Sequence, residues 1–282
     1  MIKAYLYSAD PEHCSADKWD YGLLKQTFER NNTEQVRVTE LPETDRAFVI
    51  IPGPQNKDFV DKINTELSKI GRVVLFLTGD EERVFPVNKI SHPNIVIWVN
   101  YIKEHEVDMY HSLPIGTPQR IKDYVPAYPE KIYDVYFGGQ ITHTRRKDVA
   151  KVMPTMRNAL FSPTEGFAQG NGPEQYYKDL ASAKFCPAPA GTVVVDTFRF
   201  FEALEMLTLP IGDLVNSAGK VDTFMIYALG SPPVPMVINW HDLQGVIDEY
   251  VTDYHSALHN AVAWWIKYKR DLSFKIMEHV NG

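Results

Sequence analysis

Short apolar runs alternate with segments of helical periodicity along most of the chain. The apolar runs, each bounded by Pro, Gly or charged residues, predict strands at 2–7, 35–38, 46–51, 72–77, 95–99, 133–137, 184–186 and 235–238. Helices are predicted at 19–30, 56–69, 145–159, 173–182 and 196–207. Strands that alternate with helices form β-α-β units, so the sequence predicts an α/β protein with mostly parallel sheets.

The alternating pattern is interrupted at 113–131, which contains four prolines and has no sustained periodicity. We interpret this stretch as a domain junction and expect an N-terminal domain over 1–125 and a C-terminal domain over 126–282. Two Rossmann-like domains facing each other across a cleft are the expected architecture. The tail 254–280 predicts one or two helices able to pack back on the N-terminal domain. Ligands of such sheets bind outside the carboxyl ends of the strands, so the strand exits are the places to search.

Composition narrows the class of protein. The 282 residues are 44% hydrophobic and 23% charged, as in a globular protein with a full core. The net charge of −7 gives no global sign of a nucleic-acid or membrane partner. No apolar stretch approaches membrane-spanning length, and the start has no features of a signal peptide. With only two cysteines, we expect a cytoplasmic protein, in a bacterial or viral host cytosol.

Segment 196–207 carries a charged residue at every third position of an otherwise apolar helix: Asp196, Arg199, Glu202 and Glu205. One interpretation is a solvated face with i,i+3 ion pairs. The other is a ligand-binding face, because a Pro/Gly loop leads from the strand at 184–186 into this helix. A helix N-terminus presents free N–H groups that suit a pyrophosphate. Asp196 is the expected N-cap.

The same segment resembles the signature of exostosin-like glycosyltransferases (family 47). Their pattern is K-F-C-L-C-P-R-G, then D-S-F-R-F-W-E-A-L, then G-C-I-P-V. The corresponding residues here are Lys184, Phe185, Cys186, Pro189, Gly191, Asp196, Thr197, Phe198, Arg199, Phe200, Glu202, Ala203, Leu204, Pro210 and Ile211. The resemblance is strong over 176–211 and weaker over 133–147.

This resemblance implies a GT-B fold and a nucleotide-sugar donor, with a UDP-sugar expected. It implies Glu202 on the ribose, Arg199 near the diphosphate, and the backbone from Asp196 and Thr197 near phosphate. It also implies inversion at the anomeric carbon. Two departures stand out: Ala190 replaces the arginine usual before the loop glycine, Gly191, and Leu207 replaces a glycine after the helix.

A substitute cation is available at the exit of strand 133–137. Gly138 and Gly139 would let the backbone approach a phosphate closely, and either Arg145 or Arg146 could hold it. We expect no metal or other cofactor, because the chain has no Asp-x-Asp motif and because helix dipoles and cations suit a leaving diphosphate. His105 and His111 do not form a closed set of metal ligands.

Inverting transfer needs a general base, which we expect from the N-terminal domain. Asp80 follows the apolar run 72–77 and is the first candidate; Asp10 and His13, after the first strand, are the alternatives. The expected activity is an inverting glycosyltransferase whose acceptor hydroxyl belongs to a glycan or to a hydroxymethylated base in bacteriophage DNA.

A catalytically inactive nucleotide-binding or regulatory protein is the alternative, since Ala190 removes a family arginine. A Rossmann oxidoreductase is disfavoured because no Gly-x-Gly-x-x-Gly follows the first strand.

Overall fold

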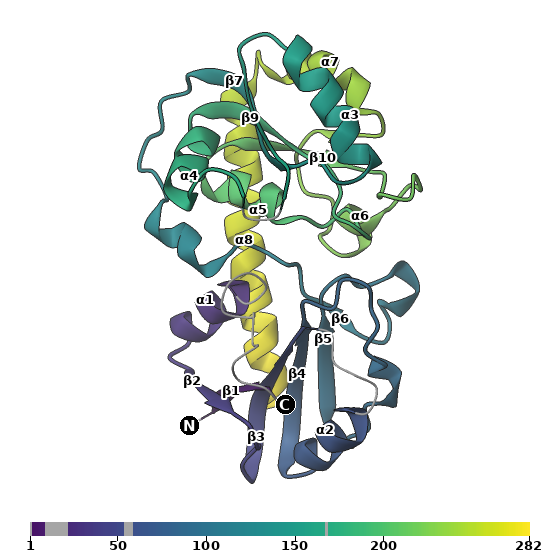
Figure 1. Ribbon diagram of the computed structural model, residues 1–282. Coiled ribbons are helices and arrows are strands. Elements are labelled where there is room, and N and C mark those ends of the chain that lie inside the picture. Colours follow the sequence, from purple (N-terminus) through teal and green to yellow (C-terminus); the bar gives the residue numbers. More distant parts are fainter. Residues whose placement is uncertain (1, 9–21, 54–58, 167–168) are drawn as a thin grey trace. The chain divides into compact units, whose positions relative to one another are not determined.

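The computed structural model describes residues 2–8, 22–53, 59–166 and 169–282. The chain forms two compact units, unit 1 with residues 1–119 and 268–282, and unit 2 with residues 120–267. The first change of unit falls inside the proline-rich stretch 113–131. The last helix, α8 (Tyr254–Asn281), begins in unit 2 and ends in unit 1 (Figure 1).

Unit 1 contains a six-stranded parallel sheet in the order β2-β1-β3-β4-β5-β6. Its strands are β1 (Lys3–Tyr7), β2 (Glu34–Val38), β3 (Thr44–Pro52), β4 (Ile70–Thr78), β5 (Ile95–Val99) and β6 (His111–Ser112). Helices α1 (Gly22–Arg30) and α2 (Phe59–Leu67) pack on it. On one face Phe28 of α1 meets Phe48 and Phe76 of the sheet at ring distances of 5.0 and 6.1 Å.

Unit 2 contains a five-stranded parallel sheet in the order β11-β10-β9-β7-β8. Its strands are β7 (Tyr133–Gln140), β8 (Ala159–Thr164), β9 (Ala183–Ala188), β10 (Leu209–Asp213) and β11 (Met236–Val237). Its helices before α8 are α3 (Thr144–Val152), α4 (Pro173–Ala181), α5 (Phe198–Glu205), α6 (Phe224–Tyr227) and α7 (Leu243–Tyr250). The prediction of parallel α/β sheets is confirmed in both units.

Helices α4 and α5 share one face of the unit 2 sheet. Tyr177 and Leu180 of α4, Ala203 of α5 and the C-cap residue Met206 belong to one buried cluster, which also contains Cys186 of β9. Cys186 is therefore a buried apolar residue, and burial raises the pKa of its thiol to about 12. Helix α3 lies apart from α4 and α5, towards α7 (Figure 1).

The strand order identifies the topological switch point of unit 2. From β7 the chain moves to β8 on one side and then returns to β9 on the other side. Crossovers leave opposite sides of the sheet there, and open α/β sheets bind their ligands outside the carboxyl ends of the strands at such a point, here β7 and β9. Gly138 and Gly139 lie at the end of β7, and Pro189 and Ala190 follow β9.

One helix is shorter than its predicted range. The sequence predicts a helix over 145–159, but α3 ends at Val152, a single 3-10 turn follows, and β8 begins at Ala159. Pro154 cannot continue an α-helical hydrogen-bond ladder, and Asn158 adopts a left-handed φ of 49°. Within the described ranges, no helix is both long and apolar enough to cross a membrane.

Candidate functional site

Arg199 is held against the glycine pair at the end of β7. Its Nη2 and Nε donate to the Gly138 carbonyl at 2.8 and 3.3 Å, and its guanidinium lies 4.5 Å from the Phe137 ring centroid. Gly139 has a φ of 138°, and a Cβ there would collide with Nη2 of Arg199. Gly139 is thus required for this arginine to reach the switch point.

Glu202, one turn further along α5, is buried with two tyrosine hydroxyls. Tyr177 donates to Oε1 at 2.8 Å and Tyr176 to Oε2 at 2.9 Å. Burial raises the pKa of Glu202; the two hydroxyls, then Arg199 and Arg120, act against that rise. The buried carboxylate therefore has hydrogen bonds and two cations nearby.

Glu205, the last residue of the charged stripe, accepts a hydrogen bond from Nε1 of Trp265 on α8 at 2.8 Å. Arg199 and Glu202 are both buried, at 8% and 6% exposure. The stripe is therefore not a solvated face, and the first interpretation of the charge spacing was wrong. Arg199, Glu202 and Glu205 each bond a defined partner within unit 2.

Asp213, at the end of β10, is fully buried and pairs bidentately with Arg145. Arg145 donates from Nη2 to Oδ1 at 2.6 Å and from Nε to Oδ2 at 3.0 Å. The backbone N–H groups of Ala190 and Val215 and the indole N–H of Trp240 complete the set, at 3.1, 3.0 and 2.9 Å. Sequence reasoning missed Asp213, whose signal was an acid at the end of the apolar run "LPIGD".

The loop before α5 departs from the expected cap. The N-cap of α5 is Thr197, which makes no side-chain capping bond, and not Asp196. Both residues are buried, and the N–H of Gly191 bonds the Val194 carbonyl within the loop at 2.8 Å. The loop also reaches Asp213 through the N–H of Ala190, so the buried Ala190 anchors the loop backbone at the position of the family arginine.

The N-terminus of α3, which follows β7, places a histidine and an arginine at the carboxyl edge of the unit 2 sheet. His143 is the N-cap, and its ring nitrogens are buried. Burial first, and then the charge of Arg146, lower the pKa of His143 to about 4, so its imidazole is neutral at pH 7. Arg146 is half-buried beside it.

In unit 1, Asp80 closes the turn that follows β4. Its Oδ1 accepts the N–H of Val84 at 2.9 Å and its Oδ2 accepts the N–H of Phe85 at 3.0 Å. Its side chain is buried, with 6% exposure of the residue. Asp80 thus has a structural task, and its role as a base remains a prediction. Asp10 and His13 lie outside the described residues.

Metal-ligating side chains do not gather in the described part of the chain, where no group of three His, Cys, Asp or Glu residues could hold an ion. His105 is exposed on its loop. His111 stacks between Trp98 and His279, at ring distances of 4.8 and 4.5 Å.

Comparison of the sequence with family models and with curated proteins finds no match. Solved structures are similar in fold. The DNA-modifying enzyme β-glucosyltransferase of phage T4, determined with and without its substrate uridine diphosphoglucose, matches over 100% of both chains, with a TM-score of 0.57 and 12% identity. The two parallel α/β sheets therefore form a GT-B type fold.

Two further glycosyltransferase structures are more distant. AviGT4, involved in avilamycin A biosynthesis, has a TM-score of 0.48 at 12% identity, and the alignment covers 97% of this chain and 98% of that one. A glycosyltransferase from Rickettsia africae has a TM-score of 0.39 at 10% identity, with 98% and 90% covered. The family 47 resemblance rests on the residues of 176–211 and, more weakly, of 133–147, and none of these comparisons shows that family.

Proposed function

We propose that the protein is an inverting, nucleotide-sugar-dependent glycosyltransferase whose donor binds to unit 2. The observation that carries this proposal is the gathering of Gly139, Arg199 and Glu202 at the switch point of the unit 2 sheet. Open α/β sheets bind nucleotides at this position. The GT-B type fold over the whole chain supports the same assignment.

The donor is expected to be a UDP-sugar. Its ribose hydroxyls would donate to Glu202, and its diphosphate would lie at the N-termini of α3 and α5, where N–H groups favour an anion. Between the two candidate arginines we assign the phosphate to Arg146. The charge of Arg145 is already neutralised by its bidentate pair with Asp213.

Transfer would proceed by attack of an acceptor hydroxyl on the anomeric carbon. The bond from that carbon to the diphosphate breaks, the nucleoside diphosphate leaves, and a base takes the hydroxyl proton. Asp80 remains the first candidate for the base, with Asp10 and His13 as alternatives. Its two backbone bonds hold the carboxylate in place and leave a further lone pair on each oxygen.

Asp80→Asn tests this role. As a base, Asp80 would contribute roughly 10²–10⁴ in rate, so the variant should lose that factor in transfer while UDP affinity stays within about twofold. Transfer at the wild-type rate would confine Asp80 to closing its turn and move the base to Asp10 or His13. The matched control is Glu82→Gln, which neutralises an acid two residues away in the same loop.

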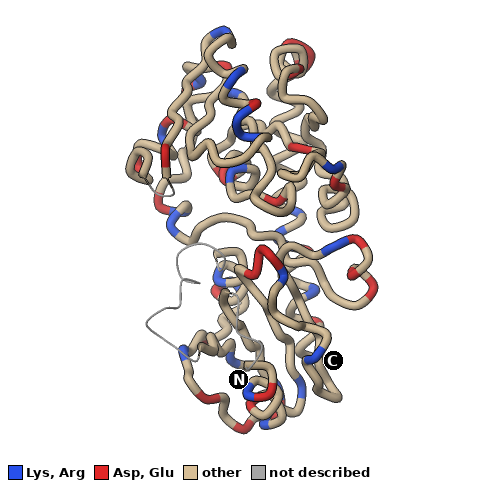
Figure 2. The backbone as a smooth tube through the Cα atoms, turned by 45° about the vertical axis from the view of Figure 1, so that its right-hand side comes forward, with Lys and Arg blue, Asp and Glu red and all other residues tan. Residues whose placement is uncertain are grey.

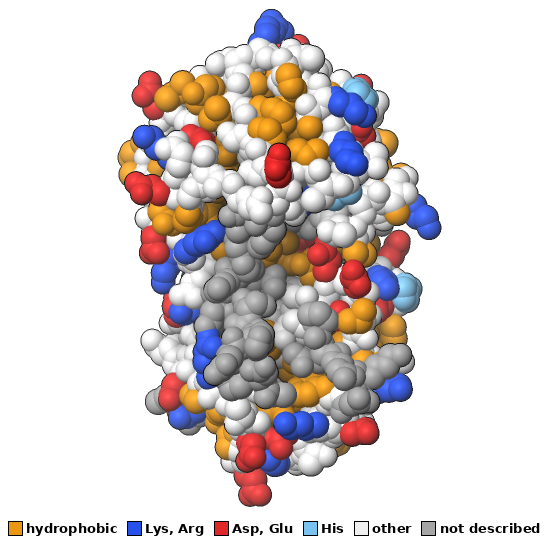
Figure 3. Space-filling view, in the orientation of Figure 1, with side chains coloured by type: hydrophobic (Ala, Val, Ile, Leu, Met, Phe, Trp, Pro, Cys, Tyr) orange, Lys and Arg blue, Asp and Glu red, His pale blue; other side chains and the backbone are white. Residues whose placement is uncertain are grey.

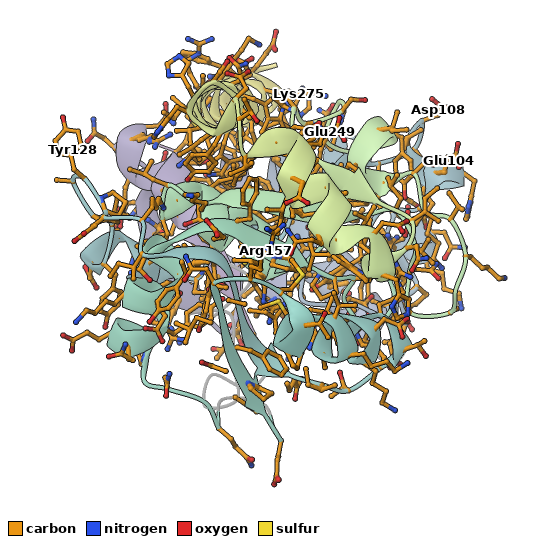
Figure 4. The ribbon with its side chains drawn as sticks, turned by 90° about the horizontal axis from the view of Figure 1, so that it is seen from above. Glu104, Asp108, Tyr128, Arg157, Glu249 and Lys275 are labelled. Carbon is orange, nitrogen blue, oxygen red and sulfur yellow. The ribbon has the colours of Figure 1, made fainter. Side chains whose placement is uncertain are left out.

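For the acceptor we favour a saccharide hydroxyl over DNA. The described loops that follow β4 and β5, over 79–86 and 100–110, carry six acids and two bases (Figure 2). Glu104 and Asp108 point outward from the second loop (Figure 4). DNA binding draws on cations that replace the counterions of phosphate, and these loops would oppose it.

A hydroxymethylated base in DNA is the second candidate acceptor, favoured by the likeness to a DNA-modifying enzyme over the whole chain. One transfer assay distinguishes between the two candidate acceptors. The protein is incubated with a UDP-sugar and either oligosaccharides or hydroxymethylcytosine DNA, at low and at moderate salt. Transfer to DNA in preference to every saccharide would reverse our choice.

The alternative function is a nucleotide-binding or regulatory protein without transfer activity. Two observations favour it: Ala190 replaces the family arginine, and Arg145 is bound by Asp213. Both reduce the cationic charge available to stabilise a leaving diphosphate.

A thermal-shift screen of UDP, ADP, GDP and their sugars tests donor binding first. A ligand at 100 times its Kd adds about 2.7 kcal/mol of stability. Slow hydrolysis of the bound UDP-sugar without acceptor would support an enzyme. Binding without hydrolysis or transfer would support the regulatory alternative, and a structure with the nucleotide on unit 1 would overturn the donor assignment.

A further inference from the structure

Tyr176 and Tyr177 are adjacent on α4, yet both hydroxyls reach the same carboxylate. Consecutive helical residues point about 100° apart, so neighbours in sequence rarely share a target. Here Tyr176 bonds Oε2 of Glu202 and Tyr177 bonds Oε1, at 2.9 and 2.8 Å. Their rings meet edge to face with centroids 5.1 Å apart, and this contact holds the two hydroxyls in their directions toward Glu202. One oxygen of Glu202 is thereby matched to each hydroxyl.

The surroundings of Glu202 extend this arrangement to the start of unit 2. The Arg120 guanidinium bonds the Tyr177 hydroxyl and lies close enough to lower the pKa of Glu202. The titratable or charged groups that interact with Glu202 come from each element around it: Arg199 on α5, Arg120, Tyr176 and Tyr177 on α4, Tyr136 on β7 and Cys186 on β9. The cations and hydroxyls favour the carboxylate form, whereas burial opposes it.

A carboxylate accepts about four hydrogen bonds, two on each oxygen. The two tyrosines occupy one position on each oxygen and leave one position on each. Two neighbouring hydroxyls, as on a ribose ring, match the remaining pair. A 2′-deoxyribose would satisfy only one of them.

We propose that Tyr176 and Tyr177 are positioning residues that direct Glu202 at the ribose diol of the donor, and so select a ribonucleoside diphosphate over its 2′-deoxy analogue. This inference rests on the proposed function. A purely structural role, in which the tyrosines only fasten α4 to α5, makes a different prediction: stability would change, but the preference between UDP and 2′-deoxy-UDP would not.

The test measures binding of UDP and of 2′-deoxy-UDP by calorimetry to the full chain and to Tyr176→Phe, Tyr177→Phe and the double variant. Phenylalanine keeps the ring and removes the hydroxyl. Each single variant should bind UDP about 10-fold more weakly, the effect expected for one hydrogen bond to a charged group. Binding of 2′-deoxy-UDP should weaken less, so the UDP preference shrinks.

Two further measurements separate positioning from general damage. In a Glu202→Gln background the double Phe change should cause little additional loss, because the tyrosines act through that carboxylate. Without the hydroxyls the pKa of Glu202 rises further, so as the pH is lowered the double variant should lose UDP affinity at a higher pH than wild type does.

Tyr124→Phe is the matched control, because Tyr124 stacks on the Tyr177 ring at 5.2 Å and belongs to the same cluster. It should leave both affinities unchanged. If wild type binds no UDP, the proposed function fails and takes this inference with it. If wild type binds UDP but the Phe variants keep its affinity and its preference over 2′-deoxy-UDP, the inference alone is overturned.

Discussion

The carboxyl edges of the two parallel sheets differ in how they use charge. In unit 2, charged side chains are buried and bonded across elements, as Arg145 of α3 is to Asp213 of β10. In unit 1, the comparable pair is Arg83 and Glu106, at 2.9 Å, which joins two loops outside the sheet. Glu82, Glu104 and Asp108 of those loops are exposed. The same sheet architecture thus provides a pre-formed charged site in one unit and an acidic rim in the other.

The complete burial of Asp213 makes its network in unit 2 costlier to disturb than the exposed acids of unit 1. Removing one partner of a buried pair leaves an uncompensated charge, whereas exposed pairs contribute little. On the face of unit 2 seen in Figure 3, hydrophobic side chains lie in small groups between charged ones. The loss of a buried network in unit 2 should therefore lower the free energy of unfolding more than the loss of an exposed pair.

Asp213→Asn should have the largest effect. It leaves the Arg145 guanidinium buried without its counter-charge and should cost about 3–5 kcal/mol of unfolding free energy. Denaturant unfolding measures this directly. Asp148→Asn, which breaks the exposed pair with Lys151, is the control and should change stability by less than about 1 kcal/mol. Equal effects would mean that the Asp213 network adds nothing over a surface pair.

Gly139→Ala comes next. A side chain there must adopt a φ of 138° and displace Nη2 of Arg199, so we expect a cost of about 1–3 kcal/mol and weaker UDP binding. Gly172→Ala is the control, since nothing lies within 4 Å of its added Cβ. Unchanged UDP affinity in Gly139→Ala would remove Arg199 from the donor site.

The two units also differ in the surroundings of a half-buried histidine. His143 in unit 2 lies beside Arg146, whereas His111 in unit 1 stacks on Trp98 and His279. Burial first, and then Lys275, lower the pKa of His111 to about 4 from an ordinary value of 6.5. The unfolded chain therefore binds the proton more tightly. The stability from a neutral His111 is complete above pH 6.5 and is lost as pH falls towards 4.

His111→Phe keeps a stacking ring and removes this titration. Its melting temperature should fall less than that of wild type between pH 7 and pH 5. His105→Gln, on an exposed loop, should follow the wild-type curve. Parallel curves for wild type and His111→Phe would show that His111 is protonated equally in both states.

Most strands could be predicted because they are uninterrupted apolar runs, and β3, β4 and β5 lie close to their predicted ranges. Two were missed. The "ALFSPT" of β8 and the "LPIGD" of β10 contain proline or glycine, which read as breaks in a local pattern. In β10 every residue is buried, so tertiary packing overrode the weak propensity.

Only the part of the candidate site that depends on local spacing could be predicted. Spacing placed Arg199 and Glu202 on one strip of a helix, but it carries no information on whether that strip faces solvent. Their partners come from distant positions: Gly138 on β7 and the tyrosines on α4. Tyr176 and Tyr177 looked like ordinary residues of the predicted helix 173–182, and only the fold brings their hydroxyls to Glu202.

The smallest expected effect concerns Leu207, where the pattern of family 47, which the segment resembles, has glycine. Helix α5 ends in a Schellman arrangement: the Thr208 N–H bonds the Ala203 carbonyl at 2.8 Å and the Leu207 N–H bonds the Leu204 carbonyl at 3.3 Å. Leu207 occupies the left-handed position with a φ of 56°. A side chain there costs roughly 1–2 kcal/mol, which glycine avoids.

Leu207→Gly should therefore stabilise unit 2 by up to about 1 kcal/mol, because the loss of a half-buried side chain offsets part of the gain. UDP affinity should stay unchanged, since Leu207 follows the end of α5 opposite to the start, where we propose that the diphosphate lies. Leu207→Ala separates the two contributions, as it loses the side chain and keeps the left-handed strain. If Leu207→Gly is less stable than Leu207→Ala, backbone strain is not what leucine imposes here, and its departure from the family pattern has another cause.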